Sequence, residues 1–289
     1  MKHWLAAFRL KTLPLALGAI ILGSKLHTLA FDFQIFLFAS LTAIFLQVLS
    51  NLANDYGDFV KGTDKHRKDR QLAGGTITPL AMKAAIVVFA VLALFSGIFL
   101  LYISFGTAWR YYLWFLGLGL VSIAAAITYT VGKKAYGYNG LGDISVFVFF
   151  GLVGVVGCSF LYRQEIDSAF WMPAIAYGCL SEGALNVNNI RDLDKDILTN
   201  KMTLASKFGK SGAFTYQFVL MLLALAGFLC YQLATGYISL APLGVAILGY
   251  VHLRKLQKAE TTDDFNQQLK FLSLGSLGVV ILFAIKLFM

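Results

Sequence analysis

Long apolar stretches recur along the whole chain, and short polar segments separate them. Each stretch is about 20 residues long, the length that an α-helix needs to cross the hydrocarbon core of a bilayer. The pattern predicts nine membrane-spanning helices at about 12–30, 33–56, 80–104, 111–131, 141–162, 169–189, 213–234, 237–253 and 271–288. No polar segment is long enough for a separate soluble domain. Residues 1–289 are therefore expected to form a single all-α transmembrane domain.

Composition and charge add an orientation. Hydrophobic residues make up 58% of the chain and charged residues 13%, with a net charge of +9. If the N-terminus is cytoplasmic, all but four of the 24 Lys and Arg residues lie on the cytoplasmic side; the exceptions are Lys25, Arg110, Arg163 and Lys286. Basic residues are retained on that side, so we expect a cytoplasmic N-terminus and, after nine spans, a C-terminus on the opposite side. No soluble basic domain is present, so a nucleic-acid partner is not expected.

Three cytoplasmic loops are enlarged, at about 57–79, 191–210 and 254–270, and the loops of the active site are expected at about 57–79, 132–140 and 191–210. Two of them begin in acidic segments that also carry asparagine, at the ends of the second and sixth predicted spans. These segments read Asn54-Asp-Tyr-Gly-Asp-Phe-Val-Lys-Gly-Thr-Asp64 and Asn188-Asn-Ile-Arg-Asp-Leu-Asp-Lys-Asp196. Charge is costly near a bilayer, so acidic clusters where membrane helices emerge are candidate functional sites.

Helical spacing gathers these side chains. Residues four apart share a helix face, so the second segment presents a stripe of Asn188, Asp192 and Asp196. In the first segment the corresponding residues are Asn51, Asn54, Asp55 and Asp58, with Asp64 beyond Gly57 and Gly62, where the helix is expected to have ended. Stacked carboxylates repel each other without a cation, and hard oxygen ligands suit Mg²⁺. The alternative is helix capping and a solvated acidic rim, which describes Asp69 and Asp194 better.

Basic side chains next to the acids are candidate ligands for the outer oxygens of a diphosphate. Arg70 and Arg191 are favoured, because Arg191 lies inside the second segment and Arg70 precedes the turn-like Gly74-Gly75. The other candidates are Lys61, Lys65, Arg67, Lys133, Lys134 and Lys201. Each of these is equally well explained as an anchor that retains the loop in the cytoplasm.

The chain resembles the intramembrane aromatic prenyltransferases of the UbiA superfamily. That family has nine transmembrane helices, and two Asp-rich motifs on the second and sixth helices bind Mg²⁺ and the diphosphate of a polyprenyl donor. The resemblance implies metal ligands at Asn54, Asp58, Asp64, Asn188, Asp192 and Asp196. The first motif departs from the common spacing, because its last aspartate follows Asp58 by six residues and Gly62 takes the closer place. This departure, with the strings at 51–64, 129–132 and 136–143, is similar to the dihydroxynaphthoate polyprenyltransferases.

The resemblance implies a reaction and roles for further residues. An all-trans polyprenyl diphosphate would be joined to 1,4-dihydroxy-2-naphthoate with loss of diphosphate and CO₂, giving demethylmenaquinone. Tyr129 is expected to shield an allylic cation, or alternatively to anchor its helix at the interface. Asp143 is expected to contact an acceptor hydroxyl rather than cap a helix. Glu182 either lines the same cavity or packs against a polar neighbour. Arg9 or Lys11 is a candidate to hold the acceptor carboxylate.

Other functions remain open at this point. Acidic residues in membrane helices also mark ion or metal transporters, although a transporter site generally lies near the midplane on broken helices. Within the family, 4-hydroxybenzoate prenylation, haem farnesylation and chlorophyll-type prenylation use the same metal site. An inactive scaffold is disfavoured because both motifs are intact. The absence of a transit-like leader favours the cytoplasmic membrane of a prokaryote, with membrane lipid around the protein.

Overall fold

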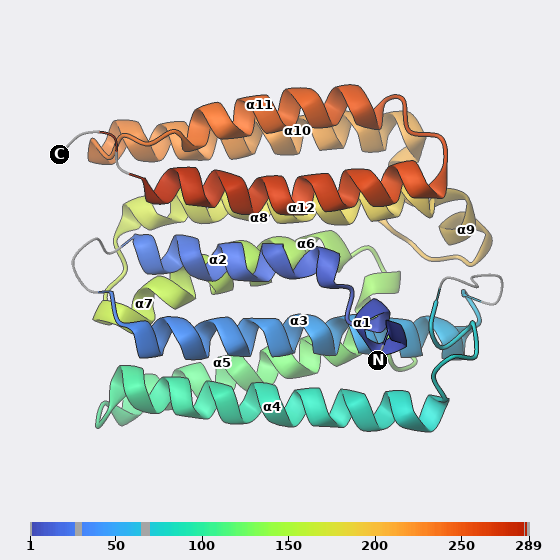
Figure 1. Ribbon diagram of the computed structural model, residues 1–289, viewed down its shortest axis with the longest axis horizontal. Coiled ribbons are helices and arrows are strands. Elements are labelled where there is room, and N and C mark those ends of the chain that lie inside the picture. The colour runs from blue at the N-terminus through green and yellow to red at the C-terminus, as the bar shows by residue number, and fades with distance from the viewer. Residues whose placement is uncertain (1, 27–30, 65–69, 286, 288–289) are drawn as a thin grey trace.

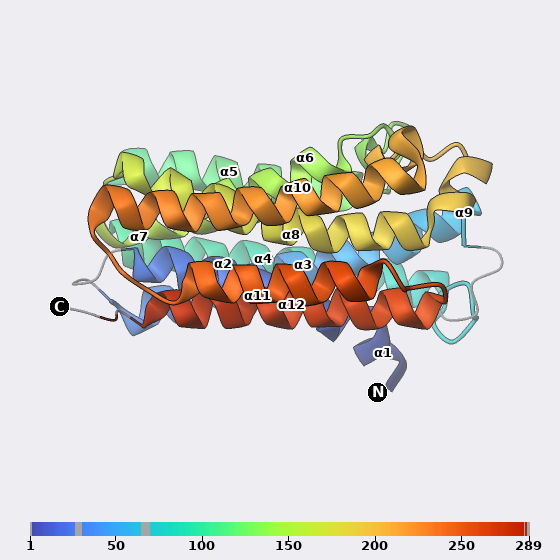
Figure 2. The same ribbon diagram turned by 90° about the horizontal axis from the view of Figure 1, so that it is seen from above.

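The computed structural model describes residues 2–26, 31–64, 70–285 and 287, and the elements in these ranges are helical (Figure 1). The long helices lie side by side along one direction in both views (Figures 1 and 2). In chain order the elements are α1 (Lys2–Ala7), η1 (Leu10–Thr12), α2 (Leu13–Lys25), α3 (Phe33–Lys61), α4 (Pro79–Phe105), α5 (Trp109–Thr128), η2 (Tyr136–Tyr138), α6 (Gly142–Val146), the π-helical η3 (Phe147–Gly157), α7 (Cys158–Arg163), η4 (Ser168–Phe170), α8 (Trp171–Arg191), α9 (Leu193–Leu198), α10 (Leu204–Thr235), α11 (Ala241–Leu256) and α12 (Thr262–Ala284). The all-α prediction is confirmed.

Seven segments of the described chain are long and apolar enough to cross a membrane, which makes the protein a multi-pass membrane protein. They are Lys2–Lys25, Phe33–Lys61, Pro79–Phe105, Trp109–Thr128, Gly142–Arg163, Leu204–Thr235 and Thr262–Ala284. The predicted spans at 169–189 and 237–253 correspond to α8 and α11. Polar residues interrupt α8, and α11 has only 16 residues, fewer than a bilayer span usually needs. Nine spans and the orientation of the termini stay predictions.

Helix α8 lies at the centre of the bundle and packs against α10, η3 and α12. Small residues let these helices approach closely, as is usual within membranes. A Cβ added to Gly151 of η3 would come within 2.7 Å of the Ala174 carbonyl oxygen of α8, and a Cβ on Gly227 of α10 would come within 2.7 Å of the Met172 carbonyl oxygen. The position of α8, and with it the second acidic segment, is therefore fixed from two sides.

Several short elements gather at one end of the bundle. Helix α9, the end of α3 and the connection that leads into α6 lie there, whereas α12 ends at the opposite end (Figure 1). Both acidic segments belong to this end, because one occupies the last turns of α3 and the other joins α8 to α9. Two segments more than 120 residues apart in the chain thus meet at one polar end of an apolar bundle.

The helix end in the first acidic segment agrees with the expectation, whereas the second segment differs from it. Helix α3 continues through Gly57 and ends at Gly62, whose φ of 75° suits glycine and closes the helix with hydrogen bonds to the carbonyls of Asp58 and Phe59. In the second segment the predicted single helical stripe breaks at Asp192, with φ −97° and ψ 6°, and α9 starts anew. Asp196 still follows Asp192 by one turn, because its N–H donates to the Asp192 carbonyl at 2.9 Å.

Gly57 lies inside α3 at a point where the backbone of Thr130 leaves no room for a side chain. A Cβ there would lie 2.7 Å from the carbonyl carbon and oxygen of Thr130, whose hydroxyl donates to the Ala53 carbonyl at 2.9 Å. Gly57→Ala is therefore expected to push α3 away from Thr130 and to destabilise the protein by about 1–3 kcal/mol, as overpacking does. Thermal unfolding in detergent measures the change. Gly117→Ala, at a position in α5 with nothing within 4 Å, is the control. Equal stability of the two variants would contradict this packing.

Candidate functional site

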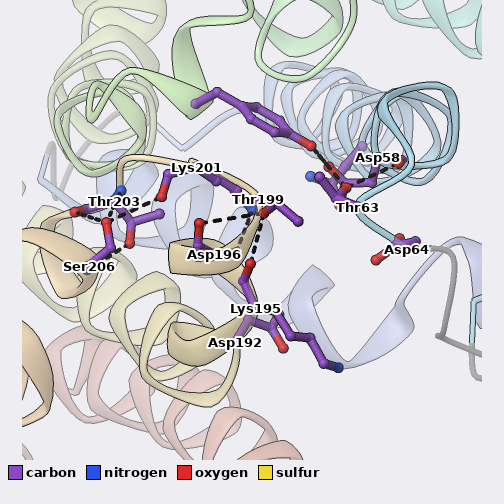
Figure 3. A network of polar contacts seen from close by, with 12 residues as sticks. Asp58, Thr63, Asp64, Asp192, Lys195, Asp196, Thr199, Lys201, Thr203 and Ser206 are labelled. Carbon is purple, nitrogen blue, oxygen red and sulfur yellow. Dashed lines mark hydrogen bonds and ion pairs between the residues drawn. The ribbon is translucent and has the colours of Figure 1, made fainter.

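A cavity of about 390 Å³ runs between α2, α3, α4, α5, η3 and α8, with the acidic segments at one end. All six residues expected to hold metal line it, namely Asn54, Asp58, Asp64, Asn188, Asp192 and Asp196. Figure 3 shows Asp58 and Asp64 on one side of the site, and Asp192 and Asp196 on the other. The fold therefore brings the two acidic segments together as the spacing of the sequence predicts.

Polar neighbours fix the residues of the first segment. The Tyr138 hydroxyl donates to Asp58 Oδ1 at 2.6 Å, and Arg9 Nη2 donates to Asn54 Oδ1 at 2.6 Å. Asp64 pairs with Arg70, with 3.4 Å between Oδ2 and Nε. Asn54 and Asp58 thus each accept a hydrogen bond, and Asp64 is paired with a cation.

The second segment has its own cations. Arg191 grips Asp192 with two hydrogen bonds, from Nε at 3.0 Å and from Nη2 at 2.6 Å, and its Nη1 donates to Asn266 of α12 at 2.8 Å. Lys201 Nζ lies 3.7 Å from Asp196 Oδ1. The backbone fixes Lys201 as well, since its N–H donates to the Asp196 carbonyl at 2.8 Å.

The loop after α9 is held at the start of α10. Thr203 and Ser206 form a capping box there, in which each side chain accepts a hydrogen bond from the other residue's backbone N–H. The Ser206 hydroxyl also donates to the Lys201 carbonyl at 3.2 Å (Figure 3). These hydrogen bonds fix the loop, and the loop places Lys201 at the acidic end of the cavity.

Burial and the crowding of carboxylates together determine the electrostatics of this end. Burial raises the pKa of Asp196 to about 6; Lys201 lowers it, whereas Asp192 and Asp58 raise it further. Burial acts to lower the pKa of Lys201, but the carboxylates of Asp58, Asp196, Asp192 and Asp64 outweigh burial and raise it. Lys201 thus lies within the combined field of both acidic segments, where a cation is strongly favoured.

The residues present fit a divalent cation that is shared with a ligand. The described residues contain no cluster of three or more His, Cys, Asp or Glu side chains that could hold a metal ion on its own. Mg²⁺ is usually held by one or two carboxylates, and waters and substrate phosphates complete its shell. Asp196 Oδ2 is buried and has no hydrogen-bond partner among the described residues, so it is an oxygen donor in need of a cation.

The structure separates the other candidates into groups. Arg70, Arg191, Lys201 and Tyr129 line the cavity. Lys133 is exposed and lies outside the cavity wall that the described residues form. Lys65 and Arg67 lie outside the described residues.

Asp143 lies behind the cavity wall rather than on it. Its side chain is 1% exposed and lies near the backbone of Leu204 at the start of α10. Tyr129, which does line the cavity, is an electrostatic neighbour of Asp143. Glu182 is buried in α8 near Asp143 and is likewise absent from the wall that the described residues form. Neither acid is placed to touch a ligand in the cavity directly.

Two contacts of the site escaped the sequence analysis. Tyr138 binds Asp58, and Asn266 accepts hydrogen bonds from both Lys11 and Arg191 at 2.8 Å each. Tyr138 lies within the string 136–143 that carries the resemblance, so a signal for it was present. Asn266 lies in a predicted polar loop with no motif around it, so the sequence offers no comparable signal.

The cavity becomes apolar away from the acids, and a smaller cavity adjoins its polar end. Leucine, isoleucine, valine and phenylalanine side chains of α4, α5 and η3 line the deeper part, including Leu101, Phe115 and Phe149. The second cavity, of about 320 Å³, is lined by Arg9, Lys11, Arg70, Arg191 and Asp55 together with apolar residues of the N-terminal segment. Arg9, Arg70 and Arg191 belong to both walls, so the two cavities meet at these arginines.

Comparisons with known proteins agree with this geometry. The sequence model of the UbiA prenyltransferase family matches residues 12–275. A 1,4-dihydroxy-2-naphthoate octaprenyltransferase of Haemophilus influenzae is 43% identical over 242 residues, which cover 81% of this chain and 78% of that protein. A protein of the same name from Escherichia coli is 41% identical over 298 residues, covering 99% of this chain and 95% of its own.

Solved structures share the fold. A UbiA homologue from Aeropyrum pernix superposes with a TM-score of 0.73 at 16% identity, covering 94% of this chain and 98% of that one. A UbiA homologue from Archaeoglobus fulgidus, bound to DMAPP and Mg²⁺, gives a TM-score of 0.65 at 13% identity, covering 96% and 99%. At these identities the likeness concerns the fold alone.

Proposed function

Because the chain belongs to the UbiA prenyltransferase family and is a prenyltransferase, we propose that it transfers a polyprenyl chain from an all-trans polyprenyl diphosphate to 1,4-dihydroxy-2-naphthoate, with loss of diphosphate and CO₂. The product is demethylmenaquinone. The choice of acceptor rests on the names of the relatives at 41–43% identity. Their bacterial origin also supports the cytoplasmic membrane of a prokaryote as the location.

One observation supports this function above the others: the two acidic segments form one end of a cavity whose remaining wall is mainly apolar. A polyprenyl diphosphate has the same division, with a charged head and a long hydrocarbon tail. A transporter site near the midplane of the bilayer would place its acids in the middle of the helices. Here they lie at helix ends.

The metal ligands are proposed to be Asn54, Asp58, Asp64, Asn188, Asp192 and Asp196. Mg²⁺ bound there would supply charge stabilisation to the departing diphosphate. The basic residues would bind the outer diphosphate oxygens. Arg70, Arg191 and Lys201 are paired with Asp64, Asp192 and Asp196 in this structure, so the acids can exchange these partners for a metal while the bases turn to phosphate.

The wall of the cavity would protect the reacting carbon from water. Tyr129 stands at the boundary between the acidic end and the apolar part, with its ring centroid 5.3 Å from that of Tyr136, which also lines the cavity. Their π faces would stabilise positive charge that develops on the allylic carbon, by roughly 1–2 kcal/mol each when desolvated. The acidic end of the cavity would thus stabilise the negative charge of the leaving diphosphate, and the tyrosine rings would stabilise the positive charge of the allylic carbon.

The second cavity supports a place for the acceptor. A dihydroxynaphthoate is a flat anion, and Arg9, Lys11, Arg70 and Arg191 give this cavity a positive wall next to the diphosphate end. Arg9 and Lys11 are proposed to hold the acceptor carboxylate. The naphthalene ring of the acceptor would then face the allylic carbon at the junction of the two cavities, where Arg9, Arg70 and Arg191 line both.

Asp143 is proposed to act on the acceptor step through Tyr129, its electrostatic neighbour on the cavity wall. Asp143→Asn keeps the shape but removes the charge, so we expect a lower rate with the aromatic acceptor and an unchanged Mg²⁺ requirement. Steady-state kinetics with acceptor and Mg²⁺ varied in turn measures both. An altered Mg²⁺ requirement with unchanged acceptor kinetics would overturn this role.

The proposed function is tested with purified protein, Mg²⁺, a labelled long-chain polyprenyl diphosphate and two competing acceptors, dihydroxynaphthoate and 4-hydroxybenzoate. Prenylation of the naphthoate together with CO₂ release is the expected result. Preference for the benzoate would leave the proposed metal site unchanged and would show that the acceptor is a hydroxybenzoate. No transfer to either acceptor would refute the proposal.

A further inference from the structure

Tyr138 joins the two acidic segments, although neither contains it. It ends the short turn η2 between α5 and α6. Its hydroxyl donates to Asp58 Oδ1 at 2.6 Å and lies 3.1 Å from the Thr63 hydroxyl. A bond of this length to a carboxylate is in the range of charge-assisted hydrogen bonds, which are about twice as strong as neutral ones. Asp58 is 4% exposed, so water offers little competition for this bond.

Two lysines contact the ring of Tyr138, one from the first acidic segment and one from the loop that follows the second. Lys61, in the last turn of α3, places Nζ 3.8 Å from the ring centroid. Lys201, from the loop after α9, places Nζ 5.3 Å from it. Both distances fall within the reach of a cation–π contact. One side chain therefore contacts a carboxylate and a lysine of the first segment and a lysine that follows the second.

The backbone around Tyr138 is fixed on both sides. Its carbonyl accepts a hydrogen bond from the Met202 N–H at 3.0 Å, which ties η2 to the residue after Lys201. On the other side, the Gly137 N–H donates to the Tyr129 carbonyl at 2.9 Å, and a Cβ on Gly137 would lie 2.7 Å from that oxygen. These hydrogen bonds fix the position of Tyr138 relative to both acidic segments.

We propose that Tyr138 is a positioning residue that orients Asp58 for the divalent cation and holds Lys201 at the diphosphate end. The proposal rests on the function proposed above. Tyr138 lies outside the cavity wall formed by the described residues, so it acts through these neighbours and not by touching substrate. Its hydrogen bond occupies Asp58 Oδ1 and leaves Oδ2 as the oxygen for the metal.

Tyr138→Phe removes the hydroxyl and keeps the ring. Because a hydrogen bond to a charged group contributes about 1.5 kcal/mol or more, we expect the Mg²⁺ concentration for half-maximal turnover to rise about tenfold. The KM of the acceptor should stay unchanged. Mn²⁺ binding in the presence of inorganic pyrophosphate, followed by electron paramagnetic resonance, should weaken by the same factor without any turnover. Tyr138→Ala also removes the ring, so the KM of the polyprenyl diphosphate should rise as well.

Tyr237→Phe is the matched control. Tyr237 lies in the connection between α10 and α11, and its hydroxyl donates to the Phe283 carbonyl of α12 at 2.9 Å, away from both acidic segments. This variant should keep the wild-type Mg²⁺ requirement and Mn²⁺ affinity. Thermal unfolding of both tyrosine variants reports whether the bundle is intact.

A double-mutant cycle in Mn²⁺ binding separates positioning from a general structural effect. If Tyr138 acts through Asp58, Tyr138→Phe should have no further effect on Mn²⁺ affinity in an Asp58→Asn background. Equal losses in both backgrounds, or wild-type Mn²⁺ affinity in the single variant, would overturn the proposal. Failure of the proposed function would look different, since the wild-type protein itself would then show no Mg²⁺-dependent prenyl transfer.

Discussion

Asp192→Asn is expected to lower kcat by about three orders of magnitude while the protein stays folded. Asparagine has the same shape but no charge, so the second segment would hold a divalent cation less well, and several kcal/mol of leaving-group stabilisation would be lost. The change also removes the carboxylate that Arg191 grips at 2.6 and 3.0 Å. Arg191 keeps its bond to Asn266, so it should remain near the site. Turnover at saturating substrate, over a range of Mg²⁺ concentrations, measures the loss.

Asp194→Asn is the matched control for this variant. Asp194 lies two residues further along the same segment, is exposed, and does not belong to the cavity wall of the described residues. Its replacement should leave turnover unchanged, because its side chain points to water. Wild-type turnover in Asp192→Asn, or an equal loss in Asp194→Asn, would remove Asp192 from the proposed metal site.

Chelation of divalent cations is expected to abolish turnover without unfolding the protein. Asp64, Asp192 and Asp196 each have a basic partner in this structure, so the bundle should keep its stability when the metal is withdrawn. Activity should return with Mg²⁺ and return poorly with Ca²⁺, which is larger and takes more ligands at longer distances. Prenyl transfer and thermal unfolding, each measured with EDTA and after the addition of either ion, test both halves of the prediction.

Two results would contradict this expectation in different ways. Full turnover in EDTA would exclude the metal and leave only the basic residues to stabilise the diphosphate. Loss of the folded bundle in EDTA would show that the cation has a structural role, which the paired acids argue against.

The acidic segments were foreseeable, and the details of their helices were not. Spacing alone gathered Asn188, Asp192 and Asp196, and the fold does bring them to one cavity. The break at Asp192 was missed, since a helical period fits the sequence on both sides of it. The helix end before Asp64 was predicted and lies at Gly62, but the sequence did not show that Gly57 inside the helix admits the Thr130 backbone. A glycine in a sequence does not reveal whether it serves a turn or a close approach.

The sequence by itself determined the helical architecture, because apolar length and polar interruption are properties of a continuous stretch of chain. It also determined that carboxylates and asparagines stand at the ends of two such stretches. Tertiary structure alone decided that Tyr138 reaches Asp58 across 80 residues, that Asn266 receives both Lys11 and Arg191, and that Asp143 lies behind Tyr129. Such contacts depend on how close the helices pack and which way their faces turn, and these are set by the small residues of the whole bundle at once.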